Sequence, residues 1–162
     1  MPIRRGRRGP LYAGELLQSP LYSRTCKDAF RIMERLAAMG RPGSFRSLPV
    51  LAAETGMSVP TITQLVTFLR RGGLVAERRP SGAISLTRPA SQISMFDVIR
   101  ATDGAGLLRR CLLGLAECSD ATACPVHSFW KQAREVLEQH LQTQTVADLA
   151  QAMAQKRRAR RR

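Results

Sequence analysis

The strongest constraint on the fold lies in the stretch GSFRSLPVLAAETGMSVPTITQLVTFLRRGGLV, which starts at residue 43 and holds two short amphipathic patterns around a glycine. The pattern predicts a helix over Leu48–Thr55, a turn at Gly56, and a second helix after Ser58, a favourable N-cap residue. The Gly72-Gly73 pair ends the second helix. Two short helices joined by a tight turn that contains glycine are typical of a helix-turn-helix unit. An ordinary pair of packed helices is the alternative.

The second of these helices is expected to present a polar face opposite its apolar stripe. Short hydroxyl and amide side chains flanked by arginines suit a helix that enters the major groove of DNA. The side chains expected on this face are Thr61, Thr63, Gln64, Thr67, Arg70 and Arg71.

A short hairpin is predicted directly after the second helix. Residues 74–77 and 83–87 have the composition of strands, and the basic turn between them contains Arg78 and Arg79. A hairpin with an arginine-rich tip after a helix-turn-helix unit indicates a wing. Arg78, Arg79 and Arg88 are then candidates for contact with DNA phosphates. A solvated turn without a partner is the alternative.

Three cysteines and a histidine follow within seventeen residues, in the stretch CLLGLAECSDATACPVH. Cys111, Cys118 and Cys124 have the spacing C-x6-C-x5-C, and His127 follows after two further residues. Thiolate and imidazole ligands suit zinc, and thiolates also hold iron–sulfur clusters. The spacing matches neither the common structural zinc sites nor bacterial ferredoxins. It predicts a metal or redox site, and packed, inert thiols are the alternative.

The remaining segments are predicted to be helical. A first helix begins near Leu21 with Ser23 as N-cap, and another begins at Ser94, which together with Asp97 resembles a capping box. A long amphipathic helix over residues 128–142 is expected to form a dimer or to pack on its own domain, and a short helix follows Thr145. The expected organisation is a flexible basic arm (1–20), a winged helix-turn-helix domain (21–92), a linker helix with a cysteine-rich loop (93–127), a dimerisation helix with a short terminal helix (128–154), and a disordered basic tail (155–162). The fold class is mostly α with a small β-hairpin wing.

The chain is strongly basic, with a formal net charge of +14 and a sequence pI near 11.4. Residues 1–20 carry a net charge of +3 and residues 155–162 carry +6, so most of the excess lies near the two ends. This charge predicts a polyanionic partner. No stretch is long and apolar enough for a membrane span or a secretory signal, which indicates a cytoplasmic protein.

The order of these parts resembles the bacterial winged-helix regulators typified by the cluster-assembly repressor IscR and the nitric-oxide-sensing repressor NsrR. The resemblance rests on LYSRTCKDAFRIMERLA, TGMSVPTITQLVTFLRRGGLV, LTRPASQISMFDVIRATDG, the three cysteines, CPVHSFW and TVADL. It implies a homodimer on a palindromic double-stranded DNA operator, with the long helix at the dimer interface. It also implies that the three cysteines hold an iron–sulfur cluster whose state controls DNA affinity.

The resemblance leaves the fourth ligand open. Family members that bind [2Fe–2S] through three cysteines and a histidine place the histidine where His127 stands. Others use an acidic residue of the first helix, which is Lys27 here, so the neighbouring Cys26 is the alternative ligand. A [2Fe–2S] cluster is favoured over [4Fe–4S], with zinc or no metal as alternatives. Base contacts of the family correspond to Pro60, Thr63 and Gln64, although one branch has Glu in place of Thr63.

Together these features predict a DNA-binding repressor whose operator affinity is controlled by a cluster that senses redox state, nitric oxide or iron. A cluster-free thiol switch or a zinc-binding regulator is one alternative, and a protein-interaction module without DNA binding is another. The sequence has no Ser/His/Asp set, paired carboxylates or phosphate-binding glycine loop. It therefore predicts neither an enzyme nor a small-molecule substrate.

Overall fold

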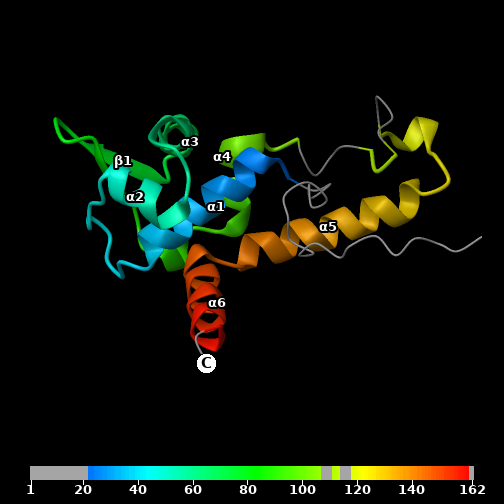
Figure 1. The fold of residues 1–162 in the computed structure, drawn as a ribbon. Helices are drawn as coiled ribbons and strands as arrows, with labels where there is room; N and C mark the ends of the chain where they lie inside the picture. Colours follow the sequence, from blue (N-terminus) through cyan, green and yellow to red (C-terminus); the bar gives the residue numbers. More distant parts are fainter. Residues whose placement is uncertain (1–21, 107–110, 114–117, 161–162) are drawn as a thin grey trace, which may run out of the picture.

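The computed structural model describes residues 22–106, 111–113 and 118–160. Helix α1 (Arg24–Ala37) packs against several other helices of the protein (Figure 1). The Ser23 hydroxyl accepts a hydrogen bond from the Cys26 N–H at 3.1 Å, which confirms the predicted N-cap. The expected arm, residues 1–20, lies outside the described residues. Four apolar residues of α1 recur at helical spacing and are at most 1% exposed: Ala29, Ile32, Met33 and Leu36.

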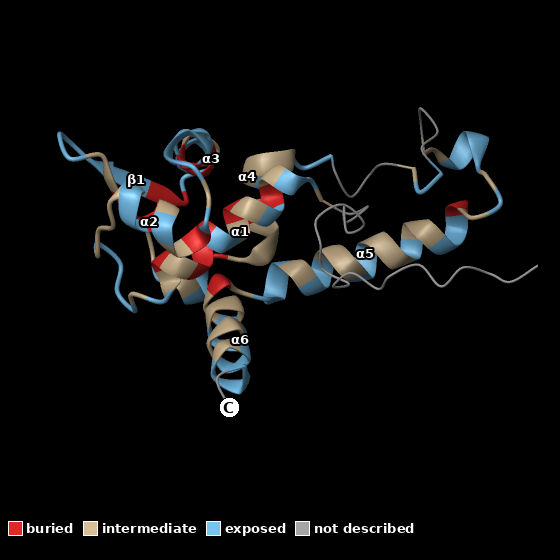
Figure 2. Cartoon of the chain, viewed as in Figure 1, coloured by how far each residue is buried: buried red, intermediate tan, exposed pale blue. Residues whose placement is uncertain are grey.

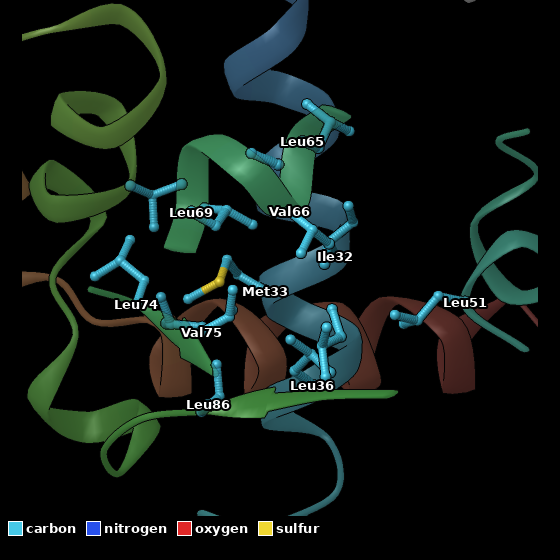
Figure 3. Close-up of a cluster of buried hydrophobic side chains, with 14 of the residues drawn as sticks. Ile32, Met33, Leu36, Leu51, Leu65, Val66, Leu69, Leu74, Val75 and Leu86 are labelled. Carbon is cyan, nitrogen blue, oxygen red and sulfur yellow. The ribbon is translucent and has the colours of Figure 1, made fainter. Parts of the chain in front are cut away.

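Helices α2 (Leu48–Thr55) and α3 (Val59–Arg71) form the predicted helix-turn-helix unit. Gly56 takes a left-handed backbone conformation (φ 68°), and its N–H donates to the Ala52 carbonyl at 2.8 Å. The Ser58 hydroxyl accepts from the Thr61 N–H and begins α3. The apolar side of α3 packs on α1 in the main core (Figure 3), through Ile62, Leu65, Val66 and Leu69.

The predicted hairpin is present as strands β1 (Val75–Arg78) and β2 (Ala83–Leu86), which pair antiparallel with Val75 opposite Leu86. Strand β1 begins and ends one residue later than expected, and β2 ends one residue earlier than expected. A short bridge that the sequence did not predict joins Arg46 to Ile84 through two backbone hydrogen bonds of 2.8 and 2.9 Å. This bridge fixes the base of the wing to the segment before α2.

A short 3₁₀ turn, η1 (Ala90–Gln92), leads into helix α4 (Met95–Asp103). The predicted capping box is confirmed, since the Asp97 N–H donates to the Ser94 hydroxyl and the Ser94 N–H donates to the Asp97 carboxylate. Helix α4 passes close to the end of α3. A Cβ atom added to Gly72 would lie 2.6 Å from the Cβ atom of Ala101, so α3 and α4 pack closely only because residue 72 is glycine.

Beyond α4, a 3₁₀ turn η3 (Asp120–Thr122) precedes helix α5 (His127–Thr143), which is one residue longer at each end than predicted. The N-terminal end of α5 projects away from the winged-helix part, whereas its C-terminal end returns to it (Figure 1). No helix in the described ranges has the length and apolar character needed to cross a membrane.

The last helix corrects an expectation about the tail. Helix α6 runs over Val146–Ala159, so the part of segment 155–162 up to Ala159 is helical and not disordered. Three features explain the extension. A capping box between Thr145 and Asp148 starts the helix, and Ala, Lys and Arg favour helix formation. Arg157 also bonds to Glu34 of α1 at 2.8 Å. The contact between Arg157 and Glu34 could not be predicted from local sequence, because the two residues are 123 positions apart.

We expect Gly72→Ala to destabilise the fold by about 1–3 kcal/mol, because the added methyl group overlaps Ala101. Urea unfolding measures the effect. Gly106→Ala is the matched control, since a Cβ atom there meets nothing within 4 Å and its backbone is not left-handed. The double variant Gly72→Ala/Ala101→Gly should be more stable than the sum of the two single effects, and strict additivity would contradict the contact.

Candidate functional site

The exposed face of α3 carries the residues predicted to contact DNA. Ile62, Leu65, Val66 and Leu69 are buried in the core, so the opposite side of α3 faces outward (Figure 2). Thr67 is half-buried, and the other predicted side chains of this face are exposed: Pro60, Thr61, Thr63, Gln64, Arg70 and Arg71.

The hydroxyl groups on this face are already bound to the helix. Thr63 donates to the Val59 carbonyl and Thr67 donates to the Thr63 carbonyl, each at 3.0 Å. These hydroxyls therefore keep only acceptor capacity and a methyl group for a ligand. No described residue forms a hydrogen bond with the Gln64 amide. Gln64 is therefore the group best able to both donate to and accept from a base edge.

Two arginines near the wing are held by neighbouring residues. Arg70 forms an ion pair with Glu77 of β1 at 2.9 Å, which joins α3 to the wing. The Arg78 guanidinium stacks on the Phe45 ring, 3.8 Å from its centroid. Arg71 and Arg79 are exposed. The face therefore combines two positioned arginines with two that reach into solvent.

Arg88, which was also considered for phosphate contact, has a structural role. Its guanidinium bonds to the Asp97 carboxylate at 3.2 Å and to the Gln92 carbonyl at 3.0 Å. These bonds connect the end of the hairpin to the capping box of α4.

The cysteine-rich loop brings one predicted thiol against the predicted histidine. The Cys118 Sγ atom lies 3.3 Å from the Nδ1 atom of His127, whose residue is only 4% exposed. The His127 N–H donates to the Cys124 carbonyl at 2.9 Å, so the last cysteine adjoins the first turn of α5. Cys111 and Cys124 are half-buried. Within the described residues, no three Cys, His, Asp or Glu side chains are arranged to hold a metal ion.

A carboxylate holds the other side of the imidazole. Asp120 Oδ1 lies 2.8 Å from His127 Nε2, and Asp120 also pairs with Lys131, one turn further along α5, at 2.8 Å. The bond from Lys131, followed by the bond to His127, lowers the pKa of Asp120, and the same pair raises the pKa of Lys131. The acceptor at Nε2 favours a proton there, which leaves the Nδ1 lone pair directed at Cys118.

The alternative ligand Cys26 lies in a different environment. It is fully buried on α1, and burial raises the pKa of its thiol to about 12. Ligation requires the thiolate, which this apolar position disfavours. Figure 2 shows the buried start of α5, where His127 lies, far from α1 within the chain. Cys26 is therefore a core residue of the described fold.

Sequence comparison identifies the class of protein that carries these features. Residues 22–152 match Rrf2, described as an iron-dependent transcriptional regulator. The chain belongs to the Rrf2 family. It is 30% identical to protein aau3 of Rhizobium meliloti (strain 1021) over 129 residues, which are 78% of this chain and 82% of aau3. It is 33% identical to the HTH-type transcriptional regulator IscR of Yersinia pseudotuberculosis serotype O:1b (strain IP 31758) over 100 residues, 61% of this chain and 60% of IscR.

Solved structures agree with this Rrf2 membership. CymR, the global cysteine regulator of B. subtilis, is 26% identical with a TM-score of 0.66, over 84% of this chain and 98% of CymR. IscR of T. potens is 25% identical with a TM-score of 0.59, over 81% of this chain and 86% of that protein. The predicted winged-helix fold is confirmed. As an Rrf2 protein the chain is a DNA-binding transcriptional regulator and not an enzyme, as the sequence predicts.

The site of this Rrf2 protein also contains residues that the sequence reading missed. Asp120, Lys131 and Arg134 surround the Cys118–His127 pair, and Arg134 donates to Cys118 Sγ at 3.7 Å. The i, i+4 spacing of His127 and Lys131 was the available signal, since it puts both side chains on one side of a helix. Nothing local links Asp120 to them, because the loop geometry decides that contact.

We expect Cys26 of this Rrf2 protein to resist alkylation in the folded state. Its pKa of about 12, against an ordinary value of 9.0, lowers the thiolate fraction at pH 8 about a thousandfold. Iodoacetamide labelling followed by peptide mass spectrometry should detect modification of Cys118 long before Cys26. Denatured protein is the control, in which all four cysteines should react. Rapid labelling of Cys26 in folded protein would contradict its placement in the core.

Proposed function

We propose that this Rrf2 protein is a homodimeric repressor whose affinity for a palindromic operator is controlled by an iron–sulfur cluster. The observation that carries the proposal is the approach of Cys118 Sγ to His127 Nδ1 at 3.3 Å, at the start of α5. A thiol and an imidazole nitrogen directed at one another are two of the donors that such a site needs. Their position in a loop with two further cysteines extends the donor set to four.

The residues that would hold the cluster are Cys111, Cys118, Cys124 and His127. A bound cluster supplies a centre that changes with oxidation, nitric oxide or iron supply. Asp120 would keep His127 in the tautomer whose Nδ1 atom is open for ligation. Histidine ligation favours [2Fe–2S] over [4Fe–4S], and the sequence similarity to IscR supports this class of cofactor.

The DNA-binding role is centred on α3. Gln64 offers a bidentate amide to a base edge, while Arg71 and Arg79 would neutralise phosphates on either side. The ion pair between Arg70 and Glu77 would fix the wing relative to α3. A two-fold dimer would place two such helices in successive major grooves, which requires a palindromic site.

Apolar surface on α5 supports the homodimer. Phe129 is 71% exposed and Val136 is 66% exposed, although both are large apolar side chains on one helix. An apolar cavity of about 310 Å³ lies where α5 meets the winged-helix part. Its lining residues come from α4, α5, α6 and the N-terminal part of the described chain: Tyr22, Lys27, Phe30, Met95, Ile99, Leu137, Leu141 and Leu149. A second copy that covers α5 would bury both features.

Helix packing offers a route from the cysteine loop to the DNA face. His127 begins α5, and the loop that carries the cysteines connects α5 to α4. Helix α4 packs directly on the end of α3 at Gly72. Ordering the loop around a ligand would therefore bias the positions of α4 and α5 and, through them, the spacing of the two recognition helices.

A cluster-free thiol switch is the second candidate. The structural similarity to CymR, a cysteine regulator, favours it, as does the Arg134 guanidinium beside the Cys118 thiol. The guanidinium donates to the sulfur at 3.7 Å, a contact that needs no bound metal. The two candidates differ in whether iron and sulfide are retained.

We expect protein purified without oxygen to show broad visible bands that bleach with dithionite, and Cys118→Ala to lose these bands together with its iron. Cys26→Ala is the matched control and should keep both, because its thiol is buried away from the loop. Unchanged iron content in Cys118→Ala would contradict the ligand set. A wild-type protein that stays colourless after reconstitution with iron and sulfide would favour the thiol switch.

A further inference from the structure

A dense group of cations ends helix α6. Lys156, Arg157, Arg158 and Arg160 lie in or directly after its last turns, and the sequence continues with Arg161 and Arg162. The described part of α6 contains just one acidic residue, Asp148, in the first turn. The C-terminal end of α6 is therefore strongly positive, and the helix gives these charges a defined place in the fold.

One of these cations joins the end of α6 to α1. Arg157 bonds to the Glu34 carboxylate at 2.8 Å, and the Glu34 side chain is only 6% exposed. Arg35 approaches the same carboxylate at 3.5 Å, so the negative charge of Glu34 is already compensated by two arginines. Lys156, Arg158 and Arg160 are exposed, and none forms an ion pair within the described part of the chain. These three side chains, with their charge unneutralised, form what we call the α6 basic end.

The α6 basic end lies on the side of the molecule away from the recognition helix. Helices α3 and α6 both pack on α1, and Figure 1 shows them on opposite sides of it. Helix α6 has 14 residues, so its last residue lies about 20 Å along the helix axis from its first. A straight duplex held against α3 does not reach that position. The charge of this end is therefore not needed for operator contact.

We propose that the α6 basic end is a second, sequence-independent surface for double-stranded DNA, so that a bound regulator contacts another duplex segment. Duplex DNA carries about one negative charge per 1.7 Å of axis, which matches closely spaced cations. The described residues of α6 include no aromatic side chain, whereas surfaces for single-stranded nucleic acid use aromatic stacking.

A membrane surface is less well matched to this helix. Membrane-bound amphipathic helices insert a broad apolar face beside their basic one. The apolar residues near the start of α6 are used inside the molecule, since Val146 is buried in the core and Leu149 lines the apolar cavity. The basic end itself therefore offers charge without an apolar face.

The test uses the full chain and a short duplex of random sequence. The variant Lys156→Gln/Arg158→Gln/Arg160→Gln removes three charges but keeps good helix formers, and circular dichroism checks the fold. The slope of its log affinity against log salt concentration should be smaller in magnitude by about 3 per subunit, because three phosphate contacts are lost. Protein saturated with a bead-bound duplex should capture a second labelled duplex, and this capture should be lost in the triple variant.

Two controls separate the surfaces. Lys156→Arg/Arg158→Lys/Arg160→Lys keeps the charge and should retain capture. Gln64→Ala/Arg71→Ala changes the α3 face and should weaken the first contact while the α6 contact remains. If that variant binds DNA as the wild type does, the result contradicts the proposed role of α3 but does not contradict the proposal of a second surface on α6.

Two results would overturn the second surface. One is a triple variant whose affinity, salt dependence and capture equal those of the wild type. The other is capture of phosphatidylglycerol vesicles by the wild type without capture of the second duplex, which would make the partner an anionic membrane.

Discussion

Burial of the apolar stripe of α1 is the interaction on which the other contacts depend. Ile32, Met33 and Leu36 are at most 1% exposed, and they hold α3, the hairpin and α6 around one core. Close packing in that core sets the orientation of α3 and of the outward face that carries Gln64. It also decides that the basic end of α6 faces away from α3, since the two helices pack on opposite sides of α1 (Figure 1).

The cysteine–histidine group obeys a different constraint, because it lies at the far end of α5 without a large apolar core of its own. Polar contacts hold it together: Asp120 joins His127 to Lys131, and Cys118 completes the group. Few buried apolar contacts mean a low local stability. Such a region is well suited to change with its ligand while the winged-helix core stays intact. Cys26, in contrast, belongs to that core and does not share this sensitivity.

Local signals in the sequence were sufficient for most of the fold. The α2 bounds, the Ser58 cap and the Ser94–Asp97 capping box were predicted because each depends on residues within four positions. Contacts between distant segments were not predictable in this way. The stacking of Arg78 on Phe45 and the bond between Arg157 and Glu34 arise only after the chain has folded. The helical tail was not predicted because the charge of residues 155–162 resembles that of a disordered segment, and because its bond to Glu34 joins distant parts of the chain. In the loop, spacing identified the thiols and His127, but it did not reveal Asp120 as their partner.

The central claim is that the state of the cysteine–histidine site controls affinity for DNA. The most direct measurement is the dissociation constant for a duplex that the protein itself enriches from sheared genomic DNA. It should be measured without oxygen on one sample, before and after the iron is removed. Two coupled sites typically change each other's affinity by about 5–150-fold, and a change of that order is the predicted result. Equal dissociation constants, with iron loss verified, would contradict control by the cluster and leave a regulator whose DNA binding is independent of it.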